Sequence, residues 1–188
     1  MAAWWTWPRL IAVALLFIAA GVAVPLLAAP GASSGSASGH SSIGFVRVDR
    51  PAPPLTLTSL TGHAQIGIAS LAGEPIVVNF WSSTCEICKS ETQALVRVAD
   101  STKGHVRFLG IDTLDLRTPA LAFAARYKIP YALSFDPQGV VEARYRLPGL
   151  PMTFFLSPSG KRIIGINTGA LTVGSLTAIL HQLYGKSV

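Results

Sequence analysis

The sequence predicts an α/β fold, with a central mixed β-sheet flanked by helices, preceded by an apolar segment and a linker. An average globular chain is about 25% charged, whereas this 188-residue chain is only 13% charged. No charged residue lies between Arg9 and Arg47, so the charges gather in residues 45–188, the length of one ordinary domain. Within that domain, apolar runs alternate with segments of helical periodicity, which favours parallel strands joined by crossover helices.

The amino-terminal third is predicted to be a membrane anchor (residues 1–29) and a flexible linker (residues 30–44). Residues 10–29 are uncharged and mostly apolar, long enough to cross a hydrocarbon core of ~30 Å as a transmembrane helix. Three tryptophans and Arg9 precede this stretch, which predicts that the domain is extracytoplasmic. A cleaved signal peptide, which would leave the domain secreted, is the alternative. The linker is rich in Gly, Ser and Ala, a composition typical of flexible chain.

The first half of the domain is predicted to begin with an N-terminal β-hairpin, formed by residues 55–60 and 64–68 around a Thr-Gly-His turn. Residues 76–81, Ile-Val-Val-Asn-Phe-Trp, form an apolar, β-branched run suited to a central buried strand. Ser and Thr residues, which are common helix N-caps, follow it, and residues 86–99 then show helical spacing of apolar side chains. A second buried strand is expected at residues 105–111.

The second half is expected to continue with a helix at residues 118–127, opened by a proline in its first turn. A strand at 131–135 ends at the turn Asp-Pro-Gln-Gly. Residues 152–156 and 161–167, joined by the turn Ser-Pro-Ser-Gly, predict an antiparallel hairpin, and residues 171–184 predict a closing helix.

The chain has two cysteines, Cys85 and Cys88, at the junction of a predicted strand and helix. The N–H groups and positive dipole end of a helix start stabilise a thiolate on the first cysteine, the nucleophile of thiol-disulfide exchange. A purely structural disulfide is the alternative, but so short a loop removes only about 2 kcal/mol of unfolded-state entropy, against nearly 5 for a loop of about 100 residues. The pattern therefore favours a redox pair. The other metal-ligating candidates, histidines at 63, 105 and 181, stand alone, so no metal or cofactor is expected.

A second motif is Gly-Leu-Pro-Met-Thr-Phe-Phe-Leu at residues 149–156, with a proline at a strand entrance, where it can be cis. With the segment NFWSSTCEICKSE, the strand end Gly-Ile-Asp at 110–112, the turn Asp-Pro-Gln-Gly and the final hairpin and helix, the sequence resembles membrane-tethered thiol-disulfide oxidoreductases of the TlpA/ResA type, within the thioredoxin superfamily. The resemblance covers about residues 50–185.

The resemblance implies a thioredoxin-like fold, a redox-active disulfide between Cys85 and Cys88, and a cis-proline facing that pair. It implies that Glu91 handles protons for the second thiol, although an acid near a helix start also interacts favourably with the dipole alone. Asn79 falls where thioredoxin has a buried acid. Thr84 and Ile87 depart from the usual Trp and Pro at their positions. The residues expected to line the substrate groove are Trp81, Thr84, Glu86, Ile87, Leu150 and Pro151; for Trp81, a place in the core is the alternative.

The expected partners are client proteins with cysteine pairs, a membrane electron-donor thiol protein and the membrane itself. No nucleic acid is expected, because the net charge of +6 is spread rather than clustered. The charge of Glu86 opposes a thiolate on Cys85 by on the order of 1 kcal/mol, comparable to the dipole gain, which predicts a moderate reductant. The resemblance implies reduction of apocytochrome c in cytochrome c maturation.

Two other functions stay open. A peroxiredoxin-like peroxidase would need a Ser or Thr three residues before its cysteine and an arginine elsewhere, and Ser82 meets only the first requirement. A copper-delivery thioredoxin-fold module would use a longer spacing between its two cysteines than the two residues found here.

Overall fold

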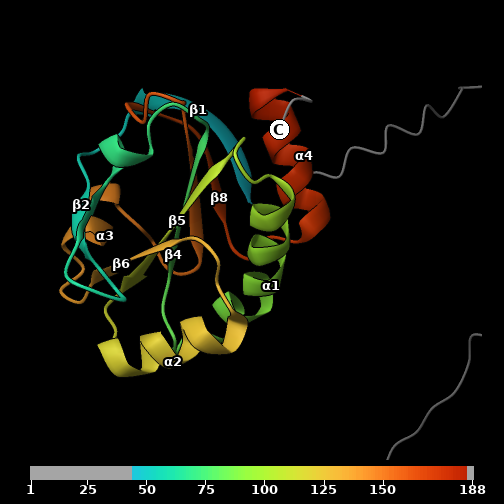
Figure 1. Ribbon diagram of the computed structural model, residues 1–188. Helices are drawn as coiled ribbons and strands as arrows, with labels where there is room; N and C mark the ends of the chain where they lie inside the picture. Colours follow the sequence, from blue (N-terminus) through green and yellow to red (C-terminus); the bar gives the residue numbers. More distant parts are fainter. Residues whose placement is uncertain (1–43, 186–188) are drawn as a thin grey trace, which may run out of the picture. The chain divides into compact units, whose positions relative to one another are not determined.

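A computed structural model of the chain describes residues 44–185 (Figure 1). The predicted anchor and the linker up to residue 43 lie outside this range. None of the helices within residues 44–185 has the length and apolar character needed to cross a membrane. The strands are β1 (Phe45–Pro51), β2 (Thr56–Ser59), β3 (Gln65–Gly67), β4 (Ile76–Trp81), β5 (Arg107–Thr113), β6 (Ala132–Asp136), β7 (Met152–Leu156) and β8 (Arg162–Thr168). The helices are η1 (Ile68–Leu71, a 3-10 turn), α1 (Glu86–Ser101), α2 (Arg117–Tyr127), α3 (Val140–Tyr145) and α4 (Val173–Tyr184).

The strands form one mixed sheet in the order β1-β8-β7-β4-β5-β6-β2-β3. Strands β4, β5 and β6 are parallel, while β7 pairs antiparallel with both β4 and β8. The predicted mixed sheet, its crossover helices and the β2–β3 hairpin are therefore confirmed. The bounds of β4 and β7 agree with the sequence, whereas β5 lies two residues and β6 one residue further along than expected.

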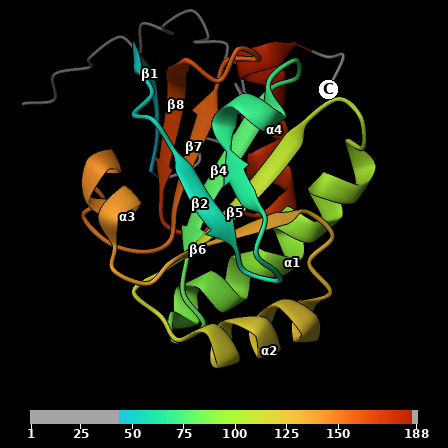
Figure 2. The same cartoon turned by 60° about the vertical axis from the view of Figure 1, so that its left-hand side comes forward.

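Helices cover both faces of the sheet (Figure 1). Alternate residues of β4 point to opposite faces. On one face, Val77 packs with apolar side chains of α1 and α4, including Leu95 and Leu176. On the other, Phe80 packs against Tyr145 of α3, with ring centroids 5.3 Å apart. Helix α2 lies at the end of the sheet where β4 leads into α1 (Figure 2).

Besides the 3-10 turn η1, two elements were not expected. Strand β1 pairs antiparallel with β8 at the sheet edge, although its residues are half-buried or exposed. Helix α3 follows the predicted Asp-Pro-Gln-Gly turn, because the carboxylate of Asp136 accepts hydrogen bonds from the N–H groups of Val140, Val141 and Glu142 at 2.9–3.0 Å. These bonds satisfy amide donors that a helix start leaves free.

Candidate active site

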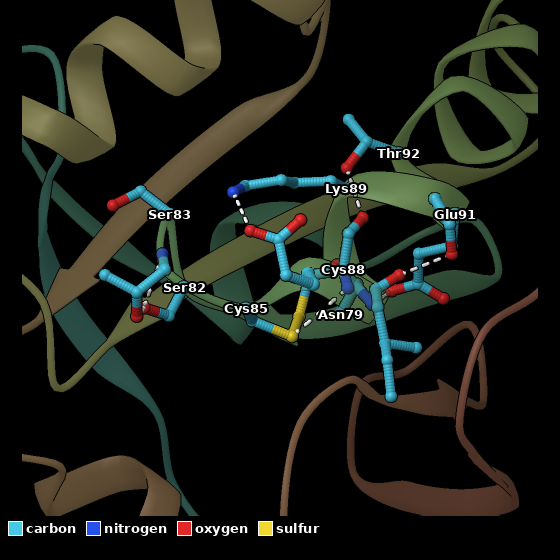
Figure 3. Close-up of a disulfide and its surroundings, with 12 residues drawn as sticks. Asn79, Ser82, Ser83, Cys85, Cys88, Lys89, Glu91 and Thr92 are labelled. Carbon is cyan, nitrogen blue, oxygen red and sulfur yellow. Dashed lines mark hydrogen bonds and ion pairs between the residues drawn. A yellow bond between two sulfur atoms is a disulfide. The ribbon is translucent and has the colours of Figure 1, made fainter.

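The two cysteines lie where β4 leads into α1. They are joined by a disulfide, with Cα atoms 5.2 Å apart (Figure 3). Cys85 is the N-cap of α1, and its sulfur accepts a hydrogen bond from the N–H of Cys88 at 3.1 Å. The sequence suggested Ser or Thr for this capping position. In the structure the Cys85 sulfur itself accepts the capping hydrogen bond, so a helix-start N–H points at an atom on which it would stabilise a thiolate charge.

The two sulfurs differ in accessibility. Cys88 is fully buried, whereas Cys85 is partly exposed. Around Cys85 the side chains of Thr84 and Glu86 are exposed, and Ile87 is 56% exposed. These residues form a mixed polar and apolar rim at the sulfur that a partner would reach first.

Glu86 has a counter-charge that sequence reasoning did not consider. The Nζ atom of Lys89 forms an ion pair with its carboxylate (Figure 3). Because opposite charges offset each other, the net electrostatic effect of Glu86 on Cys85 is smaller than the sequence suggested.

Glu91 lies one turn after Cys88 on α1 and is 1% exposed. Its carboxylate accepts hydrogen bonds from the Asn79 amide at 2.8 Å and from the N–H of Leu171 at 3.0 Å. The Asn79 amide also donates to the hydroxyl of Thr153 at 3.0 Å. Burial raises the pKa of Glu91 to about 7, although the hydrogen bonds from Leu171 and Asn79 act in the opposite direction. A buried acid that titrates near neutral pH thus lies on the same helix face as the second cysteine.

The Leu150–Pro151 peptide bond is cis, as predicted. Pro151 is buried and Leu150 is half-buried. Leu150 and Cys85 both pack against the apolar cluster that contains Trp81 and Cys88, so the β7 entrance and the cysteine pair share one patch of core.

Trp81 is 3% exposed, and its ring stacks on that of Phe123 with centroids 4.6 Å apart. Its burial favours a place in the core over a place in the substrate groove.

An acidic side chain that sequence reasoning did not assign to the site holds the loop before Cys85. Asp115, in the β5–α2 loop, accepts hydrogen bonds from the N–H of Ser83 at 2.6 Å and from the hydroxyl of Ser82 at 3.2 Å. The carbonyl of Ser82 in turn accepts from the N–H of Cys85 at 3.1 Å. The position of Cys85 therefore depends on contacts made 30 residues further along the chain.

The described residues contain no group of three or more His, Cys, Asp and Glu side chains that could hold a metal ion.

Comparison with known proteins places these features in a family. The AhpC/TSA family model matches residues 48–162. The thiol:disulfide interchange protein DsbE of Allochromatium vinosum is 35% identical over 115 residues, which are 60% of this chain and 62% of that relative. The thiol-disulfide oxidoreductase ResA of Oceanobacillus iheyensis is 25% identical over 141 residues, 73% of each chain. The chain thus spans less than two thirds of the DsbE relative.

A solved structure of a secreted Mycobacterium tuberculosis disulfide oxidoreductase homologous to E. coli DsbE is similar, with a TM-score of 0.62 and 30% identity. The match covers 69% of this chain and 96% of that one. These relatives confirm the resemblance that the sequence motifs indicated. The chain belongs to the AhpC/TSA family, and its fold is thioredoxin-like.

Proposed function

We propose that this protein is a thiol-disulfide oxidoreductase that exchanges the Cys85–Cys88 pair with cysteine pairs of client proteins. The observation that carries the proposal is the disulfide at the start of α1, with one partly exposed sulfur and one buried sulfur. A capping N–H bonded to the Cys85 sulfur supports a thiolate there. The oxidoreductase and interchange proteins to which the chain is similar support the same chemistry.

In the proposed reaction, the Cys85 thiolate attacks one sulfur of a client disulfide and a mixed disulfide forms, while the other client sulfur leaves as a thiolate. The Cys88 thiolate then attacks the Cys85 sulfur and releases the second client sulfur. The client gains two electrons and two protons, and the Cys85–Cys88 disulfide forms. A membrane thiol protein of the same redox class would restore the dithiol by the reverse exchange.

Glu91 is the proposed proton acceptor for Cys88. Cys88 is fully buried, so its thiol needs a nearby base before it can attack. Because the pKa of Glu91 is raised to about 7, the carboxylate can take up a proton at neutral pH and give it back when the dithiol is restored.

The proposed client groove is the surface around Cys85. Its exposed or half-exposed members are Thr84, Glu86, Ile87 and Leu150, and its buried member is Pro151. Trp81 supports this surface from the core. The apolar exposure of Ile87 suits contact with an apolar side chain beside a client cysteine.

We further propose that the protein acts as an extracytoplasmic, membrane-anchored reductant, for example of apocytochrome c in cytochrome c maturation. Strong oxidants stabilise their reduced thiolate form. Here one N–H from the described residues reaches the Cys85 sulfur, and Glu86 and Lys89 offset each other. We therefore expect the midpoint potential of the pair to lie nearer to about −270 mV than to about −120 mV. The charge-free segment at 10–29 supports the anchor.

The roles of the two cysteines are tested by trapping. A Cys88→Ser variant of the full-length protein should accumulate a mixed disulfide with a Cys-x-x-Cys-His client peptide through Cys85, because the resolving thiol is missing. The matched Cys85→Ser variant should trap none, since its remaining thiol is buried. Trapping through Cys88 instead would reverse the roles, and trapping by neither variant would contradict the proposed function. Peroxide consumption without a dithiol partner, or tight binding of one copper ion, would favour the peroxidase or the copper-delivery alternative.

A further inference from the structure

Asp112, near the carboxyl end of β5, is a fully buried acid that the proposed exchange does not use. In the part of the chain that the structure describes, neither of its carboxyl oxygens has a hydrogen-bond donor within reach. A buried carboxylate without donors is strongly disfavoured relative to its neutral form. The surroundings of Asp112 therefore favour the protonated form of its side chain.

The hydrogen-bond donors near Asp112 donate to other acceptors. Asp115 takes the N–H of Ser83, the N–H of Leu116 and the hydroxyl of Ser82. Arg117, at the start of α2, donates instead to the carbonyls of Ser59 and Leu60, and its guanidinium lies 4.5 Å from the centre of the Phe135 ring. The hydrogen bonds thus favour a negative charge on Asp115 and not on Asp112.

Asp115 is a neighbouring carboxyl group whose charge acts on Asp112. Two ionised carboxylates offer acceptors only, so a hydrogen bond between the two groups requires one proton between them. Burial first, and then the neighbouring charge of Asp115, raise the pKa of Asp112 to about 8. Burial also acts to raise the pKa of Asp115, but the hydrogen bonds from Ser83 and Leu116 outweigh it and hold that pKa below its usual value.

We propose that Asp112 and Asp115 share one proton and together act as positioning residues for Cys85, with protonated Asp112 donating to the Asp115 carboxylate that holds Ser82 and Ser83. This inference deepens the proposed thiol-disulfide exchange and rests on it. Few hydrogen bonds separate the carboxyl pair from Cys85. Asp115 accepts from Ser82 and Ser83, and the carbonyl of Ser82 accepts from the N–H of Cys85.

Loss of the shared proton places two negative charges beside the loop that carries Cys85, on the fully buried Asp112 and the half-buried Asp115. The charged groups facing Asp112 are Asp115 from the β5–α2 loop and Arg117 from α2. Its partners across the sheet are the uncharged Trp81 on β4 and Phe135 on β6. Like charges repel each other and repel an incoming thiolate, so exchange at Cys85 should slow as Asp112 ionises.

The test begins with the oxidised full-length protein, in which the cysteines do not titrate. Carboxyl carbon NMR should show one aspartate with a midpoint near 8, and that signal should be absent from Asp112→Asn. A midpoint of Asp112 near the ordinary value of about 3.9 would overturn the proposal. This measurement does not depend on any client, so it separates the carboxyl pair from the proposed exchange reaction.

The second measurement is the rate at which dithiothreitol reduces the Cys85–Cys88 disulfide in the wild type and in Asp112→Asn. The asparagine keeps a donor to Asp115 but cannot ionise. Dividing the wild-type rate by the variant rate removes the effect of the ionisation of dithiothreitol itself. This ratio should be constant at neutral pH and should fall about threefold as Asp112 ionises above pH ~8. Asp49→Asn, a change at an exposed ion pair with Arg162, is the matched control and should show no such step. A ratio that stays constant to about pH 10 would overturn the positioning role.

Discussion

Two buried acids lie near the cysteine pair, and their surroundings differ. Glu91, on the α1 side, receives an amide N–H from Asn79 and a backbone N–H from Leu171. Asp112, on the β5 side, receives no donor from the described residues and is acted on by the charge of Asp115. Burial is the largest cause of the raised pKa in both cases.

The difference in hydrogen bonding separates two uses of a buried acid. Donors aimed at Glu91 lower the cost of its ionised form, so its pKa stays near neutrality, where it can exchange a proton with a thiol. Asp112 lacks that support and stays protonated at neutral pH, which suits a hydrogen-bond donor rather than a base.

The largest expected effect is on stability, in Asp112→Asn. The pKa of Asp112 rises from 3.8 to about 8 on folding. Between these values the unfolded chain loses a proton that the folded chain keeps, so the wild type is destabilised as pH rises through this window. Asparagine removes this penalty. We expect the variant to match the wild type near pH 4 and to be more stable by on the order of 2 to 3 kcal/mol near pH 8.

Urea unfolding of the oxidised proteins across this pH range measures the effect. Glu91→Gln is the matched control, because glutamine cannot accept both N–H groups that the carboxylate accepts. It should therefore show no comparable gain at neutral pH. Equal pH dependence of Asp112→Asn and wild type would remove the distinction between the two acids.

The second largest effect is expected on the rate of client reduction, in the Glu91→Gln variant. If Glu91 accepts the proton of Cys88, the rate of client reduction in the wild type should rise as pH increases through about 7, where the carboxylate becomes available. The glutamine variant should lose this rise and be slower by about tenfold or more above neutrality. Stopped-flow measurement of mixed-disulfide resolution checks this. A variant that keeps the wild-type pH profile would leave Glu91 a structural acid that joins α1 to the start of α4.

Sequence patterns located the centre of the site but not its surroundings. The apolar, β-branched run of β4 and the cysteine spacing after it are local signals, so the strand bounds and the helix start at Glu86 agree with expectation. Glu91 and Asn79 came from a family resemblance, but their other partners did not. Leu171, which donates to Glu91, lies 80 residues from it, and Thr153, which accepts from Asn79, lies 74 residues from that amide. Only the sheet order brings these residues together.

Other features were not predicted because they also depend on the folded backbone and not on a local sequence pattern. Strand β1 carries charged residues and gains its order from pairing with β8, more than a hundred residues away. Asp112 was identified as a strand end, but its position relative to Asp115 depends on the turn at Leu114, which adopts a φ of 50°. No local pattern specifies a left-handed leucine, because such a conformation is unfavourable for any residue with a Cβ atom.

A smaller effect is expected from a change of Asp115, which holds the loop before Cys85. Asp115→Asn keeps the size of the side chain but removes the charge and one acceptor, so the hydrogen bonds from Ser83 and Leu116 weaken. We expect a loss of about 1 kcal/mol in unfolding free energy, since the side chain is partly solvated, together with faster amide hydrogen exchange at Ser83. Asp49→Asn, at an exposed ion pair, should change neither quantity. Unchanged protection at Ser83 in Asp115→Asn would show that the loop is held by other contacts.

The smallest effect is expected from Glu86→Gln, which tests the charge that the sequence made prominent. The Glu86 side chain is 81% exposed and is paired with Lys89, so solvent, salt and the neighbouring ammonium group all weaken its effect on the Cys85 thiolate. Because about 30 mV corresponds to about 1.4 kcal/mol for a two-electron couple, we expect the midpoint potential to change by less than about 15 mV. Equilibration with a glutathione buffer at low and high salt measures the change. A shift well above this limit that disappears at high salt would show that Glu86 acts on the thiolate directly, and that the exposed rim contributes to the redox potential along with the two buried acids.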